Sequence, residues 1–210
     1  MARTTKSKRA SRRQKQSVDA TDLLVMELQQ INSAESQLSR VIPRLARAAE
    51  SEKLRQMLER RQEEGERILG ELEAAFDELE ESPGRNRNVA AEGLINDVRE
   101  HIQEIEEGPA LDAVLIGSVQ KTEHYCIAAW GTAKSLAQAL DEKATVKAME
   151  RALEEGKSFD EELTRLAEEE ITPTLLASEE SEESEGQEER SGEGQRSGRR
   201  DGCSERRVST

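Results

Sequence analysis

Apolar side chains recur at alternating intervals of three and four residues through most of this 210-residue chain. In the clearest series the repeating positions are Ile116, Val119, Glu123, Cys126, Trp130, Ala133, Ala137 and Leu140. Similar series run through residues 24–45, 54–79 and 148–166, and a shorter one through 94–105. This spacing brings about one side chain per turn onto a single helix face, so each segment is predicted to be a helix that packs on other helices.

Helix caps and helix breakers set the limits of these segments. The expected helices span residues 19–49, 51–80, 88–106, 109–140 and 141–169. Residue types that favour helix N-termini precede three of them, namely Asp19 or Thr21, Ser51 and Asp141. Pro173 is expected to end the ordered part, because proline cannot continue a helix without losing a hydrogen bond.

The order and spacing of the helices predict an all-α fold. The links between the first two long helices and between the last two are short, so each pair is expected to form an antiparallel hairpin. The shorter helix then lies in the long connection between the hairpins. We therefore expect a four-helix bundle of two antiparallel hairpins joined by a crossover that carries a short helix, with disordered termini.

Charge is distributed unevenly along the chain. Residues 1–18 carry seven Lys and Arg and no acid, and are expected to be a disordered basic arm. Residues 171–210 are expected to be a disordered tail rich in Ser, Gly, Glu and Arg. Residues 19–177 carry 35 acids and 18 bases, a net charge of −17 that repels nucleic acid. Only the arm is expected to contact DNA, weakly and in a salt-dependent way; the alternative is that both termini serve solubility and spacing.

Other features bear on the compartment. No stretch of about 18 apolar residues is present, so no membrane span is expected. The N-terminus has no apolar segment typical of a secretory signal, and two cysteines do not make a disulfide framework. These observations predict a cytoplasmic protein.

Each series of apolar residues forms a stripe along its helix, here called a seam. The main anomaly is that acidic residues lie on these apolar seams. Glu35, Glu64, Glu123 and Glu155 lie on or beside the seams, one in each long helix and near its middle. Because a buried carboxylate without a partner costs several kcal/mol, four converging carboxylates would require a cation, which in ferritin-like bundles is a pair of iron or manganese ions. The alternative is that some Glu residues of a Glu-rich chain fall on seams by chance. The Glu-x-x-His signature of such sites is absent.

Several segments resemble the YciE/YciF family of ferritin-like proteins. Residues 33–38 (SAESQL) resemble the opening of that family, and residues 120–132 (QKTEHYCIAAWGT) are similar to its most specific block. Residues 58–65 and 153–160 lie at the positions in the chain where that family has similar runs. The resemblance covers about residues 19–170 and implies a bundle that is usually dimeric, a di-iron site and an association with stress responses. It places Glu35, Glu64, Glu123 and Glu155 at acidic positions of the family pattern.

Three ligand positions depart from that pattern. Arg61 replaces a His, Cys126 replaces a Glu, and Gly156 replaces the second Glu of a pair. Arginine is a permanent cation that does not ligate metals, so Arg61 is expected to neutralise Glu35 or Glu64 in place of a metal charge. A thiolate at Cys126 is softer than the oxygen ligands of a di-iron site, and Gly156 offers no ligand. Cys126, His124 and Asp160 remain as accessory candidates.

Two hypotheses of different classes follow. In the first, the chain is a stress-associated metal protein that binds iron or manganese at a degenerate site and, if active, is a ferroxidase- or peroxidase-like oxidoreductase. In the second, it is a homodimeric helical bundle with no cofactor, which acts as a structural or interaction protein and is tethered to DNA or an acidic partner by its basic arm.

Overall fold

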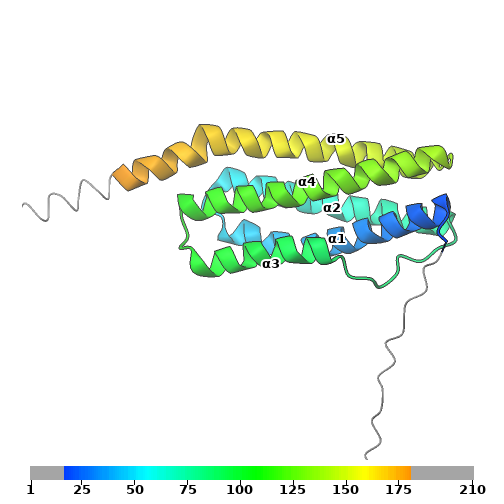
Figure 1. Cartoon of the computed structure of the whole chain (residues 1–210). Helices are drawn as coiled ribbons and strands as arrows, with labels where there is room; N and C mark the ends of the chain where they lie inside the picture. The colour runs from blue at the N-terminus through cyan, green and yellow to red at the C-terminus, as the bar shows by residue number, and fades with distance from the viewer. Residues whose placement is uncertain (1–16, 181–210) are drawn as a thin grey trace, which may run out of the picture.

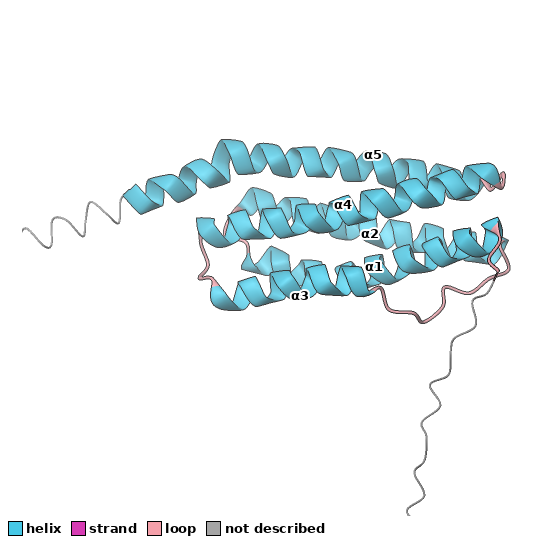
Figure 2. Cartoon of the chain, viewed as in Figure 1, coloured by secondary structure: helices cyan, strands magenta, loops and turns pink. Residues whose placement is uncertain are grey.

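A computed structural model describes residues 17–180 of the chain. Its helices are α1 (Ala20–Ala48), α2 (Glu52–Glu78), α3 (Val89–Glu104), α4 (Pro109–Ala139) and α5 (Lys143–Leu166), followed by the π-helical turn η1 (Ala167–Ile171). Within residues 17–180 there is no strand (Figure 2), so the predicted all-helical class is confirmed. The predictions for residues 1–16 and 181–210 lie outside the described residues.

The long helices lie side by side. α1 packs along α2 and α4 packs along α5, and the two pairs contact each other through α1 with α4 and α2 with α5. In Figure 1 the chain reverses direction between α1 and α2 and again between α4 and α5. α3 lies against α1 and α4, and the loop that precedes it runs back along α1. None of the helices in the described part of the chain combines the length and apolar character needed to cross a membrane.

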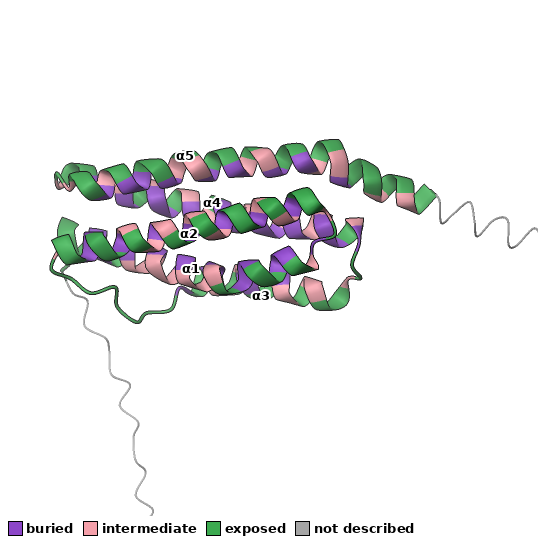
Figure 3. Ribbon diagram, turned by 180° about the vertical axis from the view of Figure 1, so that it is seen from behind, coloured by how far each residue is buried: buried purple, intermediate pink, exposed green. Residues whose placement is uncertain are grey.

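The seams form the core, as the spacing predicts. Figure 3 shows buried residues on the faces that the helices turn toward one another. The fully buried side chains include Leu24, Leu28, Leu54, Leu58, Leu72, Leu115 and Leu163. Burial of one such side chain contributes roughly 1.5–3 kcal/mol, so the repeat of three and four residues carries most of the packing energy.

Local signals position the helix starts. Asp19 closes a capping box with Asp22 at the start of α1, and the Ser51 hydroxyl accepts the Leu54 N–H at the start of α2, both as predicted. Asp112 of α4 adds a cap that sequence reasoning missed. Its buried carboxylate accepts the backbone N–H groups of Glu50 and Ser51 at 3.0 and 2.7 Å, which fastens the α1–α2 turn to α4.

Two predicted boundaries are wrong. Asp141 does not cap α5: it lies in the left-handed region at φ 59°, and Glu142 precedes the helix without a side-chain cap. Pro173 does not end the ordered part, because the helical conformation continues to residue 180. The π-helical turn η1 ends two residues before this proline. The wider turn accommodates the ring and the missing N–H, which would disrupt a regular α-helix.

Candidate functional site

Two of the four predicted carboxylates meet in the core. Glu35 of α1 and Glu123 of α4 are 0% and 2% exposed, and Arg61 of α2, also 2% exposed, lies between them. Glu64 and Glu155 do not join this cluster. Their side chains are 15% and 31% exposed and form ion pairs with Arg60 and Arg67, respectively. The structure therefore separates an inner Glu35–Arg61–Glu123 group from an outer pair of glutamates.

The Arg61 guanidinium is held by both inner carboxylates. Its Nε donates to Glu123 Oε2 at 2.8 Å, while Nη2 and Nη1 donate to Glu35 Oε1 and Oε2 at 3.1 and 3.2 Å. The contact with Glu35 is the bidentate arrangement that suits a planar guanidinium. The guanidinium carbon also lies 5.7 Å from the centroid of the Trp130 ring, a cation–π contact. Arg61 thus pairs with Glu35, one of the two partners expected from the sequence, and with Glu123 in place of Glu64.

Two glycines make room for this group. A Cβ at Gly65 would lie 3.1 Å from Arg61 Nη1 and 3.2 Å from Glu35 Oε2. A Cβ at Gly156 would lie 2.5 Å from Trp130 Cζ3 and 2.7 Å from Glu123 Oε1. From the sequence, Gly156 was expected only as a lost ligand, and Gly65 was not expected to contribute to the site. The available signal was a glycine at a core-facing seam position of a helix, where its low helix propensity requires a packing reason.

Burial and mutual contact shift the ionisation of these groups. Burial alone lowers the pKa of Arg61, but the Glu35 and Glu123 carboxylates outweigh it and hold that pKa well above its usual value. Burial raises the pKa of Glu123 to about 7, although Arg61 opposes this shift. Glu123 Oε1 has no hydrogen-bond partner among the described residues. Arg61 therefore stays charged, while Glu123 titrates near neutral pH.

The thiol of Cys126 completes the inner group. Its side chain is 2% exposed and forms a hydrogen bond with Glu35. Burial, reinforced by the charges of Glu35 and Glu123, raises the pKa of Cys126 well above its usual value. The protonated thiol is a weak ligand, because the thiolate is the form that binds metals.

The other accessory candidates lie outside the buried cluster, His124 exposed and Asp160 partly buried. His124 is 67% exposed, and its Nε2 lies 3.4 Å from Asp160 Oδ2. Asp160 also accepts a hydrogen bond from Gln120 at 3.2 Å. Neither side chain forms a hydrogen bond or ion pair with Glu35, Arg61 or Glu123 within the described part of the chain.

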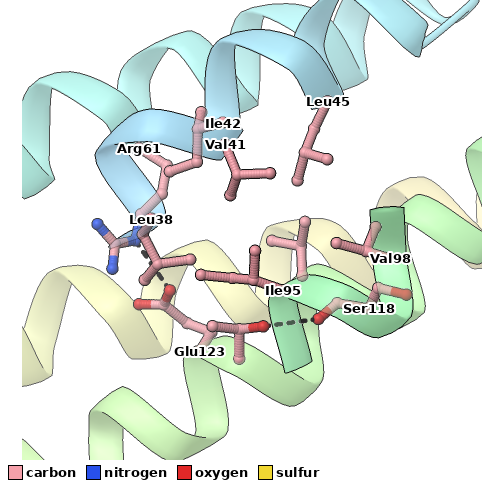
Figure 4. Close-up of a pocket in the computed structure, with 11 residues that line it drawn as sticks. Leu38, Val41, Ile42, Leu45, Arg61, Ile95, Val98, Ser118 and Glu123 are labelled. Carbon is pink, nitrogen blue, oxygen red and sulfur yellow. Dashed lines mark hydrogen bonds and ion pairs between the residues drawn. The ribbon is translucent and has the colours of Figure 1, made fainter. Parts of the chain in front are cut away.

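A small cavity adjoins the buried cluster. It has a volume of about 20 Å³ and is lined by Arg61 and Glu123, by Ser118 and Thr122, and by apolar side chains of α1, α3 and α4 (Figure 4). The Thr122 hydroxyl donates to the Ser118 carbonyl at 3.0 Å, as the second dashed line in Figure 4 marks. A cavity of this size has room for about one water molecule, so it offers no space for an organic substrate.

The donor set does not fit a two-metal centre. Both oxygens of Glu35 and one oxygen of Glu123 are engaged by Arg61, and the thiol of Cys126 is protonated. No group of three or more His, Cys, Asp and Glu side chains within residues 17–180 is arranged to hold a metal ion. A metal ion placed between Glu35 and Glu123 would meet the guanidinium, a permanent cation with no lone pair to donate. The ligand roles of Glu35, Glu64, Glu123 and Glu155 stay predictions.

Comparison with known proteins gives consistent matches. Residues 19–176 match the model of a family described as a domain of unknown function, DUF892. Protein YciF of Escherichia coli K12 is 39% identical over 151 residues, which cover 70% of this chain and 89% of YciF. The crystal structure of the E. coli stress protein YciF superposes with a TM-score of 0.68 at 37% identity and covers 71% of this chain and 94% of that one. YcfI, a putative structural protein from Rhodopseudomonas palustris, superposes with a TM-score of 0.67 at 30% identity, over 74% of this chain and 97% of the other.

Proposed function

Because the chain belongs to the DUF892 family, which its match over residues 19–176 establishes, we propose that it is a structural member of that family in which Arg61 takes the place of metal ions. Its scaffold is a ferritin-like bundle of two antiparallel hairpins joined by a crossover helix. Its role lies in its stable shape and its surfaces rather than in metal redox chemistry. The similarity to a stress protein of E. coli supports a role under stress, and that to a putative structural protein supports a role without catalysis.

The Arg61 contacts carry this proposal. Two buried carboxylates in a low-dielectric core destabilise the fold unless a cation compensates them. In a di-iron bundle that compensation comes from the metals, whereas here one guanidinium makes hydrogen bonds to both carboxylates. The charge balance of the core is therefore supplied by the chain itself.

Thermal unfolding with and without metal tests the proposal. A ligand that binds only the folded state raises stability by an amount that grows with the ratio of its concentration to Kd, about 2.7 kcal/mol at a hundredfold ratio. We expect the same Tm in the presence of a chelator, Fe²⁺ or Mn²⁺. A rise in Tm with either metal, abolished by Glu123→Gln, would contradict the proposal.

A second candidate function rests on the basic arm. Residues 1–18 carry seven positive charges and no acid, while residues 19–177 carry a net charge of −17. We propose that the arm tethers a homodimer to DNA through salt-dependent phosphate contacts. A chain that lacks residues 1–16 is then expected to lose retention on DNA at low salt. Unchanged retention would remove this candidate, and a monomer in light scattering would remove the dimer.

A further inference from the structure

A polar groove lies between α1 and the loop that connects α2 to α3. Its volume is about 410 Å³, and it includes Asn32, Ser36 and Arg40 of α1 and Arg85, Asn86 and Arg87 of the loop. Among residues 17–180, no carboxylate lines the groove. Its lining combines guanidinium, amide and hydroxyl groups, all of which can donate hydrogen bonds.

The loop side of this groove is fixed to α1 at both ends. Gln29 Nε2 donates to the Ser82 carbonyl at 2.9 Å, before the groove residues. After them, the Asn88 N–H donates to Ser33 Oγ at 2.9 Å, and Gln37 Nε2 donates to the Asn88 carbonyl at 3.1 Å. The two arginines of the loop are therefore held beside α1 by a segment that is ordered before any ligand binds, which lowers the entropic cost of binding.

Gly84 allows the turn within this loop. Its φ of +68° lies in the left-handed region, and a Cβ at this position would lie 3.2 Å from the Gln29 side chain. Glycine adopts this backbone conformation at little cost, and its lack of a Cβ leaves the Gln29 side chain room beside the turn.

The groove is locally basic on an acidic body. Residues 19–177 carry a net charge of −17. Arg40 and Arg85 nevertheless have no ion-pair partner within residues 17–180, whereas Arg87 pairs with Glu92 at 3.0 Å. Two guanidinium groups therefore face the same groove without a carboxylate between them, an arrangement that an anion would stabilise.

We propose that this groove binds the phosphate group of a small molecule. Arginine forks with Ser, Asn and Gln donors are the groups that proteins commonly use for phosphate oxygens. A polymer is disfavoured because acids flank the groove residues in the chain: Glu80 and Glu81 precede them within the loop, and Glu92 follows them in α3. A long polyanion that follows the loop would be repelled by these carboxylates, whereas a single phosphate or diphosphate group needs only the donors of the groove. The proposal does not depend on the Arg61 cluster.

Calorimetric titration of the full-length chain with inorganic phosphate and pyrophosphate at about physiological salt tests this site. We expect saturable binding of pyrophosphate that is tighter than that of phosphate. The double variant Arg40→Gln/Arg85→Gln is expected to weaken binding at least about tenfold, because it removes two charge-assisted donors. The matched control Arg99→Gln/Arg165→Gln removes the same charge outside the groove and is expected to leave binding unchanged. Equal Tm values of the two variants would establish that both fold.

Three results would overturn the proposal. Absence of saturable binding up to about 10 mM of either anion would mean that there is no site. Equal weakening in the groove variant and the control would mean that only net charge attracts the anion. Tighter binding of a short DNA duplex than of pyrophosphate, lost in the groove variant, would assign the groove to a nucleic-acid backbone instead.

Discussion

Gly156 of α5 faces the edge of the Trp130 indole of α4 so closely that a Cβ at residue 156 would lie 2.5 Å from Trp130 Cζ3. The same Cβ would lie 2.7 Å from Glu123 Oε1. The glycine thus leaves the space in which the indole covers the Arg61 guanidinium, with 5.7 Å between the guanidinium carbon and the ring centroid. The glycine at residue 156 and the indole of Trp130 therefore depend on each other.

Gly156→Ala is expected to destabilise the protein by about 1–3 kcal/mol, because the added methyl overpacks the core. The measurement is the urea midpoint of unfolding. Trp130→Tyr in the same chain is expected to relieve part of this loss, giving a non-zero coupling in a double-mutant cycle. Gly131→Ala is the matched control: its Cβ would meet nothing within 4 Å. There the gain in helix propensity is expected to stabilise the protein by about 1 kcal/mol. Similar effects at both glycines would refute the close contact.

Arg61→Leu is expected to destabilise the fold by about 3–5 kcal/mol, because it leaves two buried carboxylates without a cation. Glu35→Leu and Glu123→Leu added to Arg61→Leu are expected to recover most of that loss, since a packed apolar trio removes the uncompensated charge. Equilibrium denaturation in urea measures both changes. Arg60→Leu, which breaks the ion pairs with Glu162 and Glu64 outside the buried cluster, is the control and is expected to cost less than about 1 kcal/mol. A loss of that small size at Arg61 would mean that the inner carboxylates need no cation.

Stability is expected to fall as the pH rises through about 7. Burial raises the pKa of Glu123 to about 7 in the folded state, so the folded protein holds a proton that the unfolded chain, with a pKa of 4.5, has released. Glu123 therefore contributes its full stabilisation below its pKa in the unfolded chain. That stabilisation is lost as the pH rises through its pKa in the folded protein.

The test of this pH dependence is a comparison with Glu123→Gln, in which Glu27, Glu64 and Asp112 still titrate. Burial also raises the pKa of these three groups, so each of them also makes the unfolding free energy fall as the pH rises. The difference between the wild-type and Glu123→Gln unfolding free energies is expected to shift in favour of the variant between about pH 5 and about pH 8. A difference that does not vary with pH would show that Glu123 keeps an ordinary pKa.

The sequence predicted the helices well, because their limits follow from local physics. The repeat of three and four residues fixes the buried faces, and Asp19 and Ser51 cap their helices through their own side chains. The errors arise where tertiary or backbone effects decide. Asp141 adopts a left-handed conformation at the end of α4 instead of capping α5, and a π-helical turn before Pro173 lets the helix continue.

The site could be predicted only in part. Seam position alone distinguishes neither Glu64 nor Glu155 from the buried Glu35 and Glu123, because exposure depends on a rotation of a fraction of a turn. Charge and position indicated that Arg61 would pair with Glu35 or Glu64, and Glu35 is the partner in the structure. The contact with Glu123 could not be predicted, because it requires the Arg61 side chain to reach across the core from α2 to α4. The space left by Gly65 and Gly156 is a property of neighbouring helices and is not encoded in either segment by itself.

The redesign of the site provides a positive control for metal binding. Arg61→His, Cys126→Glu and Gly156→Glu would restore oxygen and nitrogen ligands, and Trp130→Tyr would provide space for the side chain at residue 156. This fourfold variant is expected to take up more iron than the wild type, because the guanidinium no longer occupies the inner carboxylates. Equal uptake by the two proteins would mean that the positions of the helices, and not only the side chains, have changed.

The metal content of the wild-type chain tests the central claim most directly. Mass spectrometry on protein purified without chelator, before and after anaerobic loading with Fe²⁺, measures it. Because Arg61 fills the place between Glu35 and Glu123, we expect less than about a tenth of an equivalent of iron or manganese per chain after loading. About two equivalents per chain, the content of a carboxylate-bridged pair, would contradict the account.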